Sequence, residues 1–339
     1  MESENKLIQE REIGLEEQDK EKLSEFGFSK KDIESLKEGS TDGGTSAIVC
    51  FIGNDNKDLV IKKGLNVDGD LNAKREYAFL KLLKLRGGEK NAPDPYYYNP
   101  NNDILIMEKI DGESISKMSN EDIVDVAKAL GKLHKPEFYK PGIPFHKREK
   151  ATQYNRLIEQ VNFLEEWFVQ IAPFIEKEKK MDNKSFQTLN QAKDIVLEQA
   201  RDSKQNFDES SFSLIHYDLN PENIFRDKEK NILFLDWRQA VIGDRAMDVA
   251  KLFYKNYLNK EQKELFFKSY EQKMDDLTIR QRAEVYEPLI RLGSILWRLR
   301  FLNIDIEKHP EIKKNVDINL VRERLKDDFE YLFSFVDNK

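Results

Sequence analysis

The pattern of hydrophobic and polar positions changes twice along this 339-residue chain. Residues 1–32 are dominated by Glu, Lys, Gln and Asp, which predicts a charged N-terminal extension, either a solvated helix or a frayed segment. Residues 33–108 contain short apolar runs separated by turn formers, as expected for strands. In residues 109–339 apolar residues recur at helical spacing, so this larger part is predicted to be mainly helical.

The segment 33–108 is predicted to form a small antiparallel sheet with one main helix. Its apolar runs at 47–53 and 58–63 flank a polar turn, which is typical of a hairpin. Asp70 is a candidate N-cap for the helix that follows, and Gly87 is a candidate stop. In chain order we expect a strand at 33–37, a Gly/Ser/Thr-rich loop at 39–46 and two strands at 47–53 and 58–63. A helix at 71–86, a Pro/Tyr/Asn-rich loop at 91–102 and a strand at 104–107 are expected to follow.

The C-terminal part is predicted to contain several helices and two short strands. Ser119 and Asp122 have the spacing of a capping box, which indicates a helix that begins there and ends near His134. Further helices are expected at residues 154–171, 184–203 and from 245 onward, and short apolar runs occur at 212–215 and 232–235. These two short runs flank a cluster of polar residues.

That polar cluster contains an ordered set of chemically useful side chains. The sequence SLIHYDLNPENIF matches the pattern H-x-D-L-x-x-x-N through His216, Asp218 and Asn223. Asp236 follows thirteen positions after Asn223, at the end of an apolar run. A turn rich in Asp, Asn and Pro is the structural alternative, but the ordered set between two apolar runs favours a site. This pair of motifs resembles the catalytic loop and the metal-binding strand of kinases.

The resemblance implies a role for each residue. Phosphoryl transfer passes through a loose transition state, so a protein mainly positions the reactants and neutralises charge. Asp218 would orient the acceptor hydroxyl and take its proton. Asn223 and Asp236 would bind Mg²⁺, which prefers hard oxygen ligands. His216 is interpreted as a structural residue that holds the loop.

A kinase also needs a lysine that grips the nucleotide phosphates and a helix glutamate that pairs with it. Lys62 lies in a V-I-K context, and Glu76 follows fourteen residues later inside the predicted helix. Alternation along the strand puts Lys62 on the face of Val60, which would have to be the cleft face. Lys63 is a direct competitor, and the structural alternatives are a surface lysine and a solvated glutamate.

The nucleotide contacts of the hinge and the phosphate loop follow from the same resemblance. Met107 would sit beside the adenine, although an ordinary core residue fits the same position. The backbone of Glu108 and Ile110 would hydrogen-bond the adenine edge. Ser46, in the Gly/Ser/Thr-rich loop, is a candidate contact to the triphosphate.

Several details separate the chain from protein kinases. It has no G-x-G-x-x-G, Tyr217 stands where those enzymes have Arg, and Trp-Arg follows Asp236 in place of Phe-Gly. The order H-x-D-x-x-x-x-N, L-D-W and G-D-x-x-x-D-x-A is similar to that of the aminoglycoside phosphotransferase and choline kinase superfamily. This resemblance implies an α+β, bilobal protein-kinase-like fold, with ATP or GTP as donor and Mg²⁺ as cofactor. It also implies that Asp248 is structural, tying the loop after Asp236 to the next helix.

The motifs leave the acceptor open. We expect a small molecule with a hydroxyl group, such as an aminoglycoside, an amino-alcohol or a sugar-like compound, bound partly by the helical stretch at 136–205. Polycations would need an acidic pocket and quaternary amines an aromatic box. The chain has surplus acids and three tryptophans, of which Trp167 has the helical spacing of a core residue.

Two other functions compete with a small-molecule kinase. An atypical protein kinase is opposed by the short segment between Asp236 and the next predicted helix, which leaves no room for an activation segment. A non-catalytic nucleotide-binding scaffold is opposed by the presence of Asp218, Asn223 and Asp236 together.

Composition and charge limit the location and the partners. The formal net charge of −7 makes the chain a poor general nucleic-acid binder, because phosphate contacts need clustered Lys and Arg. One cysteine excludes an intramolecular disulfide, and the four histidines lack zinc-ligand spacing. No apolar run is long enough to span a bilayer, and the acidic N-terminus is unlike a signal peptide. We therefore expect a cytoplasmic protein that binds neither nucleic acid nor membrane.

Overall fold

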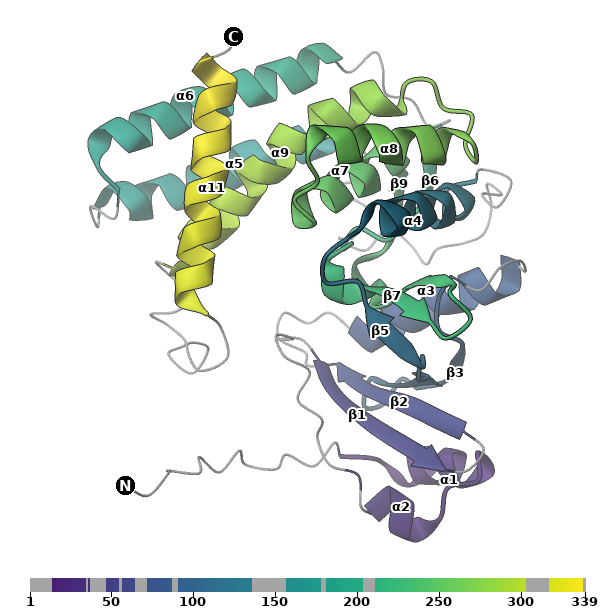
Figure 1. The fold of residues 1–339 in the computed structure, drawn as a ribbon. Coiled ribbons are helices and arrows are strands. Elements are labelled where there is room, and N and C mark those ends of the chain that lie inside the picture. The colour runs from purple at the N-terminus through teal and green to yellow at the C-terminus, as the bar shows by residue number, and fades with distance from the viewer. Residues whose placement is uncertain are drawn as a thin grey trace, which may run out of the picture. The chain divides into compact units, whose positions relative to one another are not determined.

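The computed structural model describes residues 14–34, 36, 47–54, 57–64, 72–86, 91–135, 157–177, 181–203, 211–302 and 317–337. The chain forms two compact units, each built from two stretches of sequence (Figure 1). Unit 1 comprises Met1–Glu113 and Phe225–Gln239, and unit 2 comprises Ser114–Ile224 and Ala240–Lys339. Small antiparallel sheets and a majority of helices confirm the predicted α+β class.

Unit 1 contains a four-stranded antiparallel sheet in the order β1-β2-β4-β3. The strands are β1 (Ala47–Asn54), β2 (Lys57–Gly64), β3 (Pro95–Asn99) and β4 (Ile104–Glu108). The hairpin predicted for β1 and β2 is confirmed by their pairing. Val60 pairs with Met107 and Lys62 with Leu105, so these four side chains share one face of the sheet.

Strand β3 lies in the segment that was predicted to be a loop, and that prediction is wrong for these residues. Pro95 opens the strand, and three tyrosines follow it. A proline is tolerated at the first residue of an edge strand, and tyrosine favours pleated, half-buried positions. The surrounding Pro and Asn residues concealed the strand in the sequence.

Two short helices, α1 (Glu17–Glu25) and α2 (Lys30–Glu34), pack on the sheet face opposite Lys62. Leu23, Phe28 and Ile33 are buried there against a group of sheet residues, Ile52, Leu59, Ile61, Ile104 and Ile106. The strand predicted from residue 33 is therefore a helix through Glu34. Helix α1 agrees with the helix expected in the extension, and most of its residues are exposed, but its Leu23 and Asp19 are buried. The helix therefore has one buried side and is not solvated all round.

Helix α3 (Asn72–Arg86) contacts β2 and β4 of the same sheet, as its predicted range indicated. The carboxylate of Asp103 accepts hydrogen bonds from the backbone N–H groups of Ala73 (3.3 Å) and Lys74 (3.1 Å). A carboxylate in this position satisfies donors that a helix leaves unpaired in its first turn. The predicted cap, Asp70, lies outside the described residues.

The chain returns to unit 1 after the polar cluster. A three-stranded sheet in the order β5-β7-β8 contains β5 (Gly112–Ser114), β7 (Ile224–Asp227) and β8 (Ile232–Phe234). The backbone N–H of Phe234 donates to the carbonyl of Asn91 at 2.8 Å, and the Asn91 side chain donates to the carbonyl of Ile232 at 3.3 Å. These bonds hold the returning segment, which ends in the 3₁₀ turn η6 (Trp237–Gln239) beside α3.

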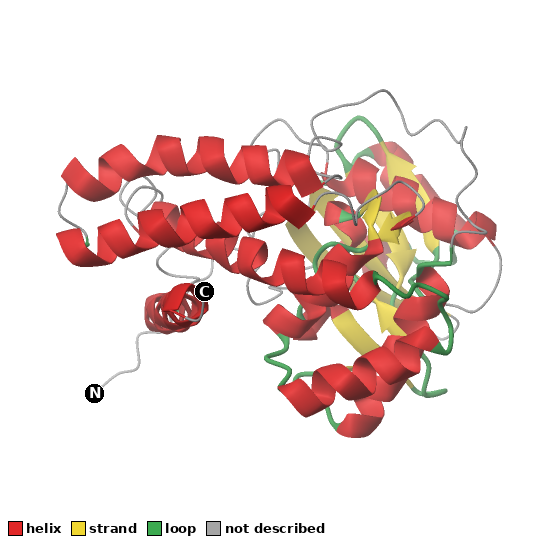
Figure 2. Ribbon diagram, turned by 90° about the horizontal axis from the view of Figure 1, so that it is seen from above, coloured by secondary structure: helices red, strands yellow, loops and turns green. Residues whose placement is uncertain are grey.

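Unit 2 is mainly helical and contains one small sheet, β6 (Phe212–Ile215) paired with β9 (Val241–Asp244). Its helices are α4 (Asn120–Leu133), α5 (Leu157–Lys177), α6 (Asn183–Asp202), α7 (Arg245–Lys255), α8 (Lys260–Glu271), α9 (Ile279–Arg300) and α11 (Ile318–Asp337). Helix α9 contacts α5, α6, α7 and α11, so it is the central element of this unit. Figure 2 shows, in red, how much of the structure is helical. The predicted capping box of Ser119 and Asp122 begins α4. Among the described residues no helix is long and apolar enough to cross a membrane.

Candidate active site

The structure brings Lys62, Glu76 and Asp236 together in unit 1. The Lys62 ammonium donates to both carboxylate oxygens of Glu76, at 2.9 and 3.0 Å, and lies 3.5 Å from Oδ1 of Asp236. Strand β2, helix α3 and the returning segment each supply one of the three residues. Lys63 points to the opposite sheet face by alternation, so Lys62 is the lysine that meets the carboxylates.

Burial and the two neighbouring carboxylates determine the protonation state of Lys62. The side chains of Lys62 and Glu76 are only 13% and 3% exposed. Burial by itself would lower the pKa of Lys62, but the carboxylates of Asp236 and Glu76 raise it above its ordinary value. Lys62 is therefore held as a cation, with a carboxylate on either side.

Asp236 has an unusual backbone conformation, with φ of 63°. Non-glycine residues adopt this left-handed region infrequently, and such strain is often found at functional sites. The Asp236 carboxylate also lies 3.2 Å from Nε of Arg238, a cation that the sequence motifs did not assign to the site. The geometry thus presents a partly exposed carboxylate between two positive groups.

Three predicted nucleotide contacts lie at or near the end of β4. Met107 is buried on the face that it shares with Lys62. The backbone N–H of Glu108 already donates to the carbonyl of Asp94 at 2.9 Å, so an adenine contact by Glu108 would use its carbonyl oxygen. The backbone contact of Ile110 stays a prediction. The remaining candidate, Ser46, lies outside the described residues.

Asp218 lies in unit 2, in the loop between β6 and β7, with two asparagines bonded to it. The Asn220 side chain donates to Oδ1 of Asp218 at 2.9 Å, and the Asn223 side chain donates to the Asp218 backbone carbonyl at 2.8 Å. The first bond orients the carboxylate. The second bond uses the amide nitrogen of Asn223 as a donor. The amide oxygen is the atom of this side chain that can bind a cation.

The oxygen donors of Asn223 and Asp236 fit the chemistry of Mg²⁺. Among the described residues no three His, Cys, Asp or Glu side chains form a preformed cluster for a metal ion. Mg²⁺ is commonly held by one or two protein oxygens together with substrate phosphates and water, so it does not need such a cluster. Each unit therefore offers one suitable donor, Asn223 in unit 2 and Asp236 in unit 1.

Asp248 holds the loop that carries Asp218. Its carboxylate accepts hydrogen bonds from the backbone N–H groups of His216 and Tyr217, each at 2.7 Å. The Asp218 N–H in turn donates to Nδ1 of His216 at 3.3 Å, which fits the structural role predicted for that histidine. Asp248 was predicted to tie the loop after Asp236 to the next helix; its described partners instead precede Asp218.

His134 extends this arrangement into the core of unit 2. Its Nε2 lies 3.2 Å from the Asp248 carboxylate, and its Nδ1 lies 2.8 Å from the Tyr270 hydroxyl. A carboxylate only accepts and a tyrosine can donate, so the neutral tautomer with hydrogen on Nε2 satisfies both contacts. Burial lowers the pKa of His134 despite the Asp248 carboxylate, which agrees with a neutral ring.

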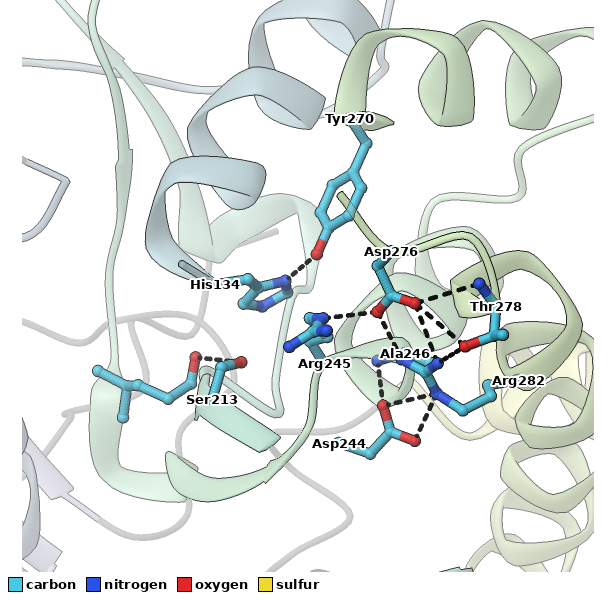
Figure 3. Close-up of polar contacts among 10 residues, drawn as sticks. His134, Ser213, Asp244, Arg245, Ala246, Tyr270, Asp276, Thr278 and Arg282 are labelled. Atoms are coloured by element: carbon cyan, nitrogen blue, oxygen red, sulfur yellow. Dashed lines mark hydrogen bonds and ion pairs between the residues drawn. The ribbon is translucent and has the colours of Figure 1, made fainter. Parts of the chain in front are cut away.

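A buried ionic network fixes the start of α7, the helix that carries Asp248 (Figure 3). Asp244 accepts a hydrogen bond from the N–H of Ala246 at 2.9 Å and pairs with Nε of Arg282 at 3.0 Å. Arg282 and Arg245 both reach the carboxylate of Asp276, each at 2.7 Å. Burial alone would raise the pKa of Asp276, but the two guanidinium groups lower it well below its usual range. The network was not predicted, because its members are scattered across the sequence.

The three tryptophans left open by the sequence have different surroundings. Trp237 is fully buried and its indole N–H donates to the carbonyl of Phe234 at 2.6 Å, so it is a core residue of unit 1. Trp167 packs against Phe163 within α5. Trp297 is 47% exposed and stacks on an aromatic neighbour one turn on.

Comparisons with known proteins agree with the resemblance that the sequence motifs indicated. The model of the phosphotransferase enzyme family matches residues 41–284. No curated protein sequence matches the chain. Among solved structures, choline kinase LicA from Streptococcus pneumoniae is similar, with a TM-score of 0.63 and 18% identity over 93% of this chain and 97% of that one.

Two further solved structures share the fold. An ethanolamine kinase from Plasmodium vivax has a TM-score of 0.61 and 20% identity, over 91% of this chain and 86% of that one. The ADP-bound aminoglycoside phosphotransferase APH(2'')-Ib has a TM-score of 0.59 and 17% identity, over 94% of this chain and 97% of that one.

Proposed function

Since the chain belongs to the phosphotransferase enzyme family and is thus a kinase for small-molecule hydroxyl groups, we propose that it transfers the γ-phosphoryl group of ATP or GTP with Asp218 as its catalytic carboxylate. The solved structures with this fold include choline and ethanolamine kinases and an aminoglycoside phosphotransferase with ADP bound, which supports a nucleotide donor.

Asp218 accepts the proton of the acceptor hydroxyl as the new bond to phosphorus forms. A general base must be oriented toward that proton before its pKa matters. The hydrogen bond from Asn220 fixes one carboxylate oxygen, and the hydrogen bonds that Asp248 accepts fix the backbone on the N-terminal side of Asp218. These contacts support a preorganised base, so little reorganisation is needed during the reaction.

Lys62 binds the phosphates of the nucleotide, and Glu76 keeps its ammonium in place. The observation that carries the proposal is the position of this buried cation, between a helix carboxylate and the carboxylate of Asp236. Asn223 and Asp236 are the residues that would hold Mg²⁺. When bound, the ion neutralises charge on the phosphate oxygens.

The proposal is tested by nucleotide consumption with Mg²⁺ over a panel of hydroxylated small molecules, with Asp218→Asn as the control. Acceptor-dependent turnover that falls at least about 10²-fold in Asp218→Asn is expected. An established activity that survives this substitution would contradict the role of Asp218. Phosphate transfer only to proteins, or nucleotide binding without transfer to any acceptor, would instead favour a protein kinase or a non-catalytic scaffold.

A further inference from the structure

Helix α7 runs alongside the loop that carries Asp218. Near its start, Asp248 accepts the hydrogen bonds from the N–H groups of His216 and Tyr217. At its end, the side chain of Asn256 donates to the carbonyl of Leu219 at 3.0 Å. Residues on both sides of Asp218 are therefore bonded to the same helix, and the side of that helix that carries Asp248 is directed toward the loop.

Two lysines lie between the anchors. Lys251 follows Asp248 by three residues and Lys255 follows Lys251 by four, so all three lie on one side of the helix. The Lys251 ammonium lies 3.4 Å from the ring centroid of Tyr217, the residue directly before Asp218. Both lysines are partly buried, and of the carboxylates it is Asp218 that has the largest electrostatic effect on each of them.

Within the described part of the chain, Lys251 and Lys255 have no paired carboxylate. Among the residues that the structure describes, no carboxylate lies within ion-pairing distance, 4.0 Å, of either ammonium. Burial lowers the pKa of Lys251 to about 8 and also lowers that of Lys255. The carboxylate of Asp218 only partly opposes this effect on both lysines, and that of Asp248 adds to its influence on Lys251. Arg298 and Arg324 add positive charge near Lys255. Arg298 is neutralised by the carboxylate of Asp328.

Partial burial of several cations destabilises the folded protein unless a negatively charged group lies close to them. Asp218 alone cannot neutralise two ammonium groups. An acceptor with a positive charge, such as choline, would meet like charge beside the catalytic carboxylate. An acceptor with a negative group would instead be attracted there, and its hydroxyl would be placed near Asp218.

We propose that Lys251 and Lys255 form an anion-binding subsite for the acceptor, which is therefore a hydroxylated molecule with a carboxylate or phosphate group. This inference rests on the proposed kinase function and adds the charge of its substrate. The two lysines determine specificity and position the acceptor; Asp218 performs the proton transfer.

The test compares acceptors that differ in charge. Glycerate, gluconate and glycerol phosphate are the anionic members of the panel, glycerol and glucose are neutral, and choline, ethanolamine and an aminoglycoside are cationic. Each is assayed with the wild type, Lys251→Met, Lys255→Met and the double variant. Lys268→Met, at an exposed position of α8, is the matched control.

Turnover that favours an anionic acceptor is expected, with kcat/KM for that acceptor reduced at least 10-fold in each lysine variant. The KM for the nucleotide and the activity of Lys268→Met should be unchanged. The carboxylate and phosphate members of the panel show which group the subsite takes. A merely structural role of the lysines would lower the melting temperature without a selective loss of kcat/KM for the anionic acceptor.

Turnover of cationic acceptors that the lysine variants leave unchanged would overturn the subsite but retain the kinase. An equal loss for all acceptors, with a higher KM for the nucleotide, would also overturn it. If no acceptor is turned over, glycerate or inorganic phosphate should raise the melting temperature of the wild type but not of the double variant; equal shifts would refute the subsite. Failure to bind any nucleotide would instead refute the proposed function.

Discussion

The backbone N–H of Tyr217 donates a 2.7 Å hydrogen bond to Oδ1 of Asp248, a residue 31 positions further along the chain. Tyr217 has φ of 69°, a left-handed conformation that is uncommon for a bulky side chain and is retained only where surrounding contacts enforce it. Asp248 therefore sets the backbone conformation directly before Asp218.

Asp248→Asn should lower both stability and activity. An amide offers one oxygen and one NH₂ group where the carboxylate now receives the N–H groups of His216 and Tyr217. One buried donor would lose its acceptor, at a cost of about 1 to 3 kcal/mol in the free energy of unfolding. Urea unfolding and kcat measure the two effects, and Asp327→Asn, at an exposed position of α11, is the control that should change neither.

Lys62→Met should reduce kcat/KM by about 10²-fold, because a positioned cation for the phosphates is lost. Lys63→Met is the matched control, since that lysine lies on the other face of β2. Its activity should stay within a few fold of the wild type. A larger loss in Lys63→Met than in Lys62→Met would show that the two lysines have been assigned the wrong roles.

His134 should make the protein less stable in mild acid. Burial lowers its pKa below the ordinary 6.5, with the carboxylates of Asp248 and Asp244 opposing this and Arg245 favouring it. Below about pH 6.5 the unfolded chain therefore takes up a proton that the folded ring does not, so stability falls as pH falls, by up to about 1.4 kcal/mol per pH unit.

His134→Gln removes this titration, and glutamine can still donate to Asp248 and accept from Tyr270. Urea unfolding at pH 5.5 and 7.5 should show a smaller difference between the two pH values for the variant than for the wild type. If the variant and the wild type lose the same stability between pH 7.5 and pH 5.5, His134 is already protonated in the folded protein at pH 5.5.

Lys251→Met should stabilise the protein while it impairs acceptor use. The folded-state pKa of about 8 lies below the ordinary 10.5, so folding with a charged Lys251 is unfavourable at neutral pH, by at most on the order of 3 kcal/mol. Between about pH 8 and 10.5, Lys251 is neutral in the folded wild type but still protonated in the unfolded chain. The unfolded chain therefore loses its advantage as pH rises, and the cost disappears above about pH 10.5.

Melting temperatures at pH 7 and pH 9.5 test this prediction. The variant should exceed the wild type at pH 7, and the gap should narrow at pH 9.5. A variant that is less stable than the wild type at pH 7 would indicate that Lys251 is a favourable packing or cation–π partner of Tyr217.

Local patterns predicted the elements that depend on local chemistry. The hairpin of β1 and β2, helix α3 and the capping box at Ser119 follow from alternation, helical spacing and turn residues, and the structure confirms them. The ion pair of Lys62 with Glu76 was also predictable, because the motif requires one lysine in a strand and one glutamate in the helix that follows.

Contacts between distant segments were not predictable in the same way. The burial of α1 depends on where Leu23 meets the sheet, and β3 is a strand because β4 pairs with it. Asp248 was assigned to the wrong loop because spacing along a chain does not identify which backbone N–H groups a carboxylate will meet. The α7 lysines carry no motif, and only their distance from Asp248 on a helix could have singled them out.

The return of residues 225–239 to unit 1 has a consequence for biosynthesis. Asp236 and the strand that bonds to Asn91 are made long after β1 to β4 have left the ribosome. Domains commonly fold in order during synthesis, but unit 1 remains incomplete until about half of the helical unit has also emerged. Until then Lys62 has only Glu76 as a paired carboxylate in unit 1, and a fragment that ends at residue 113 would contain the Lys62–Glu76 pair without Asp236.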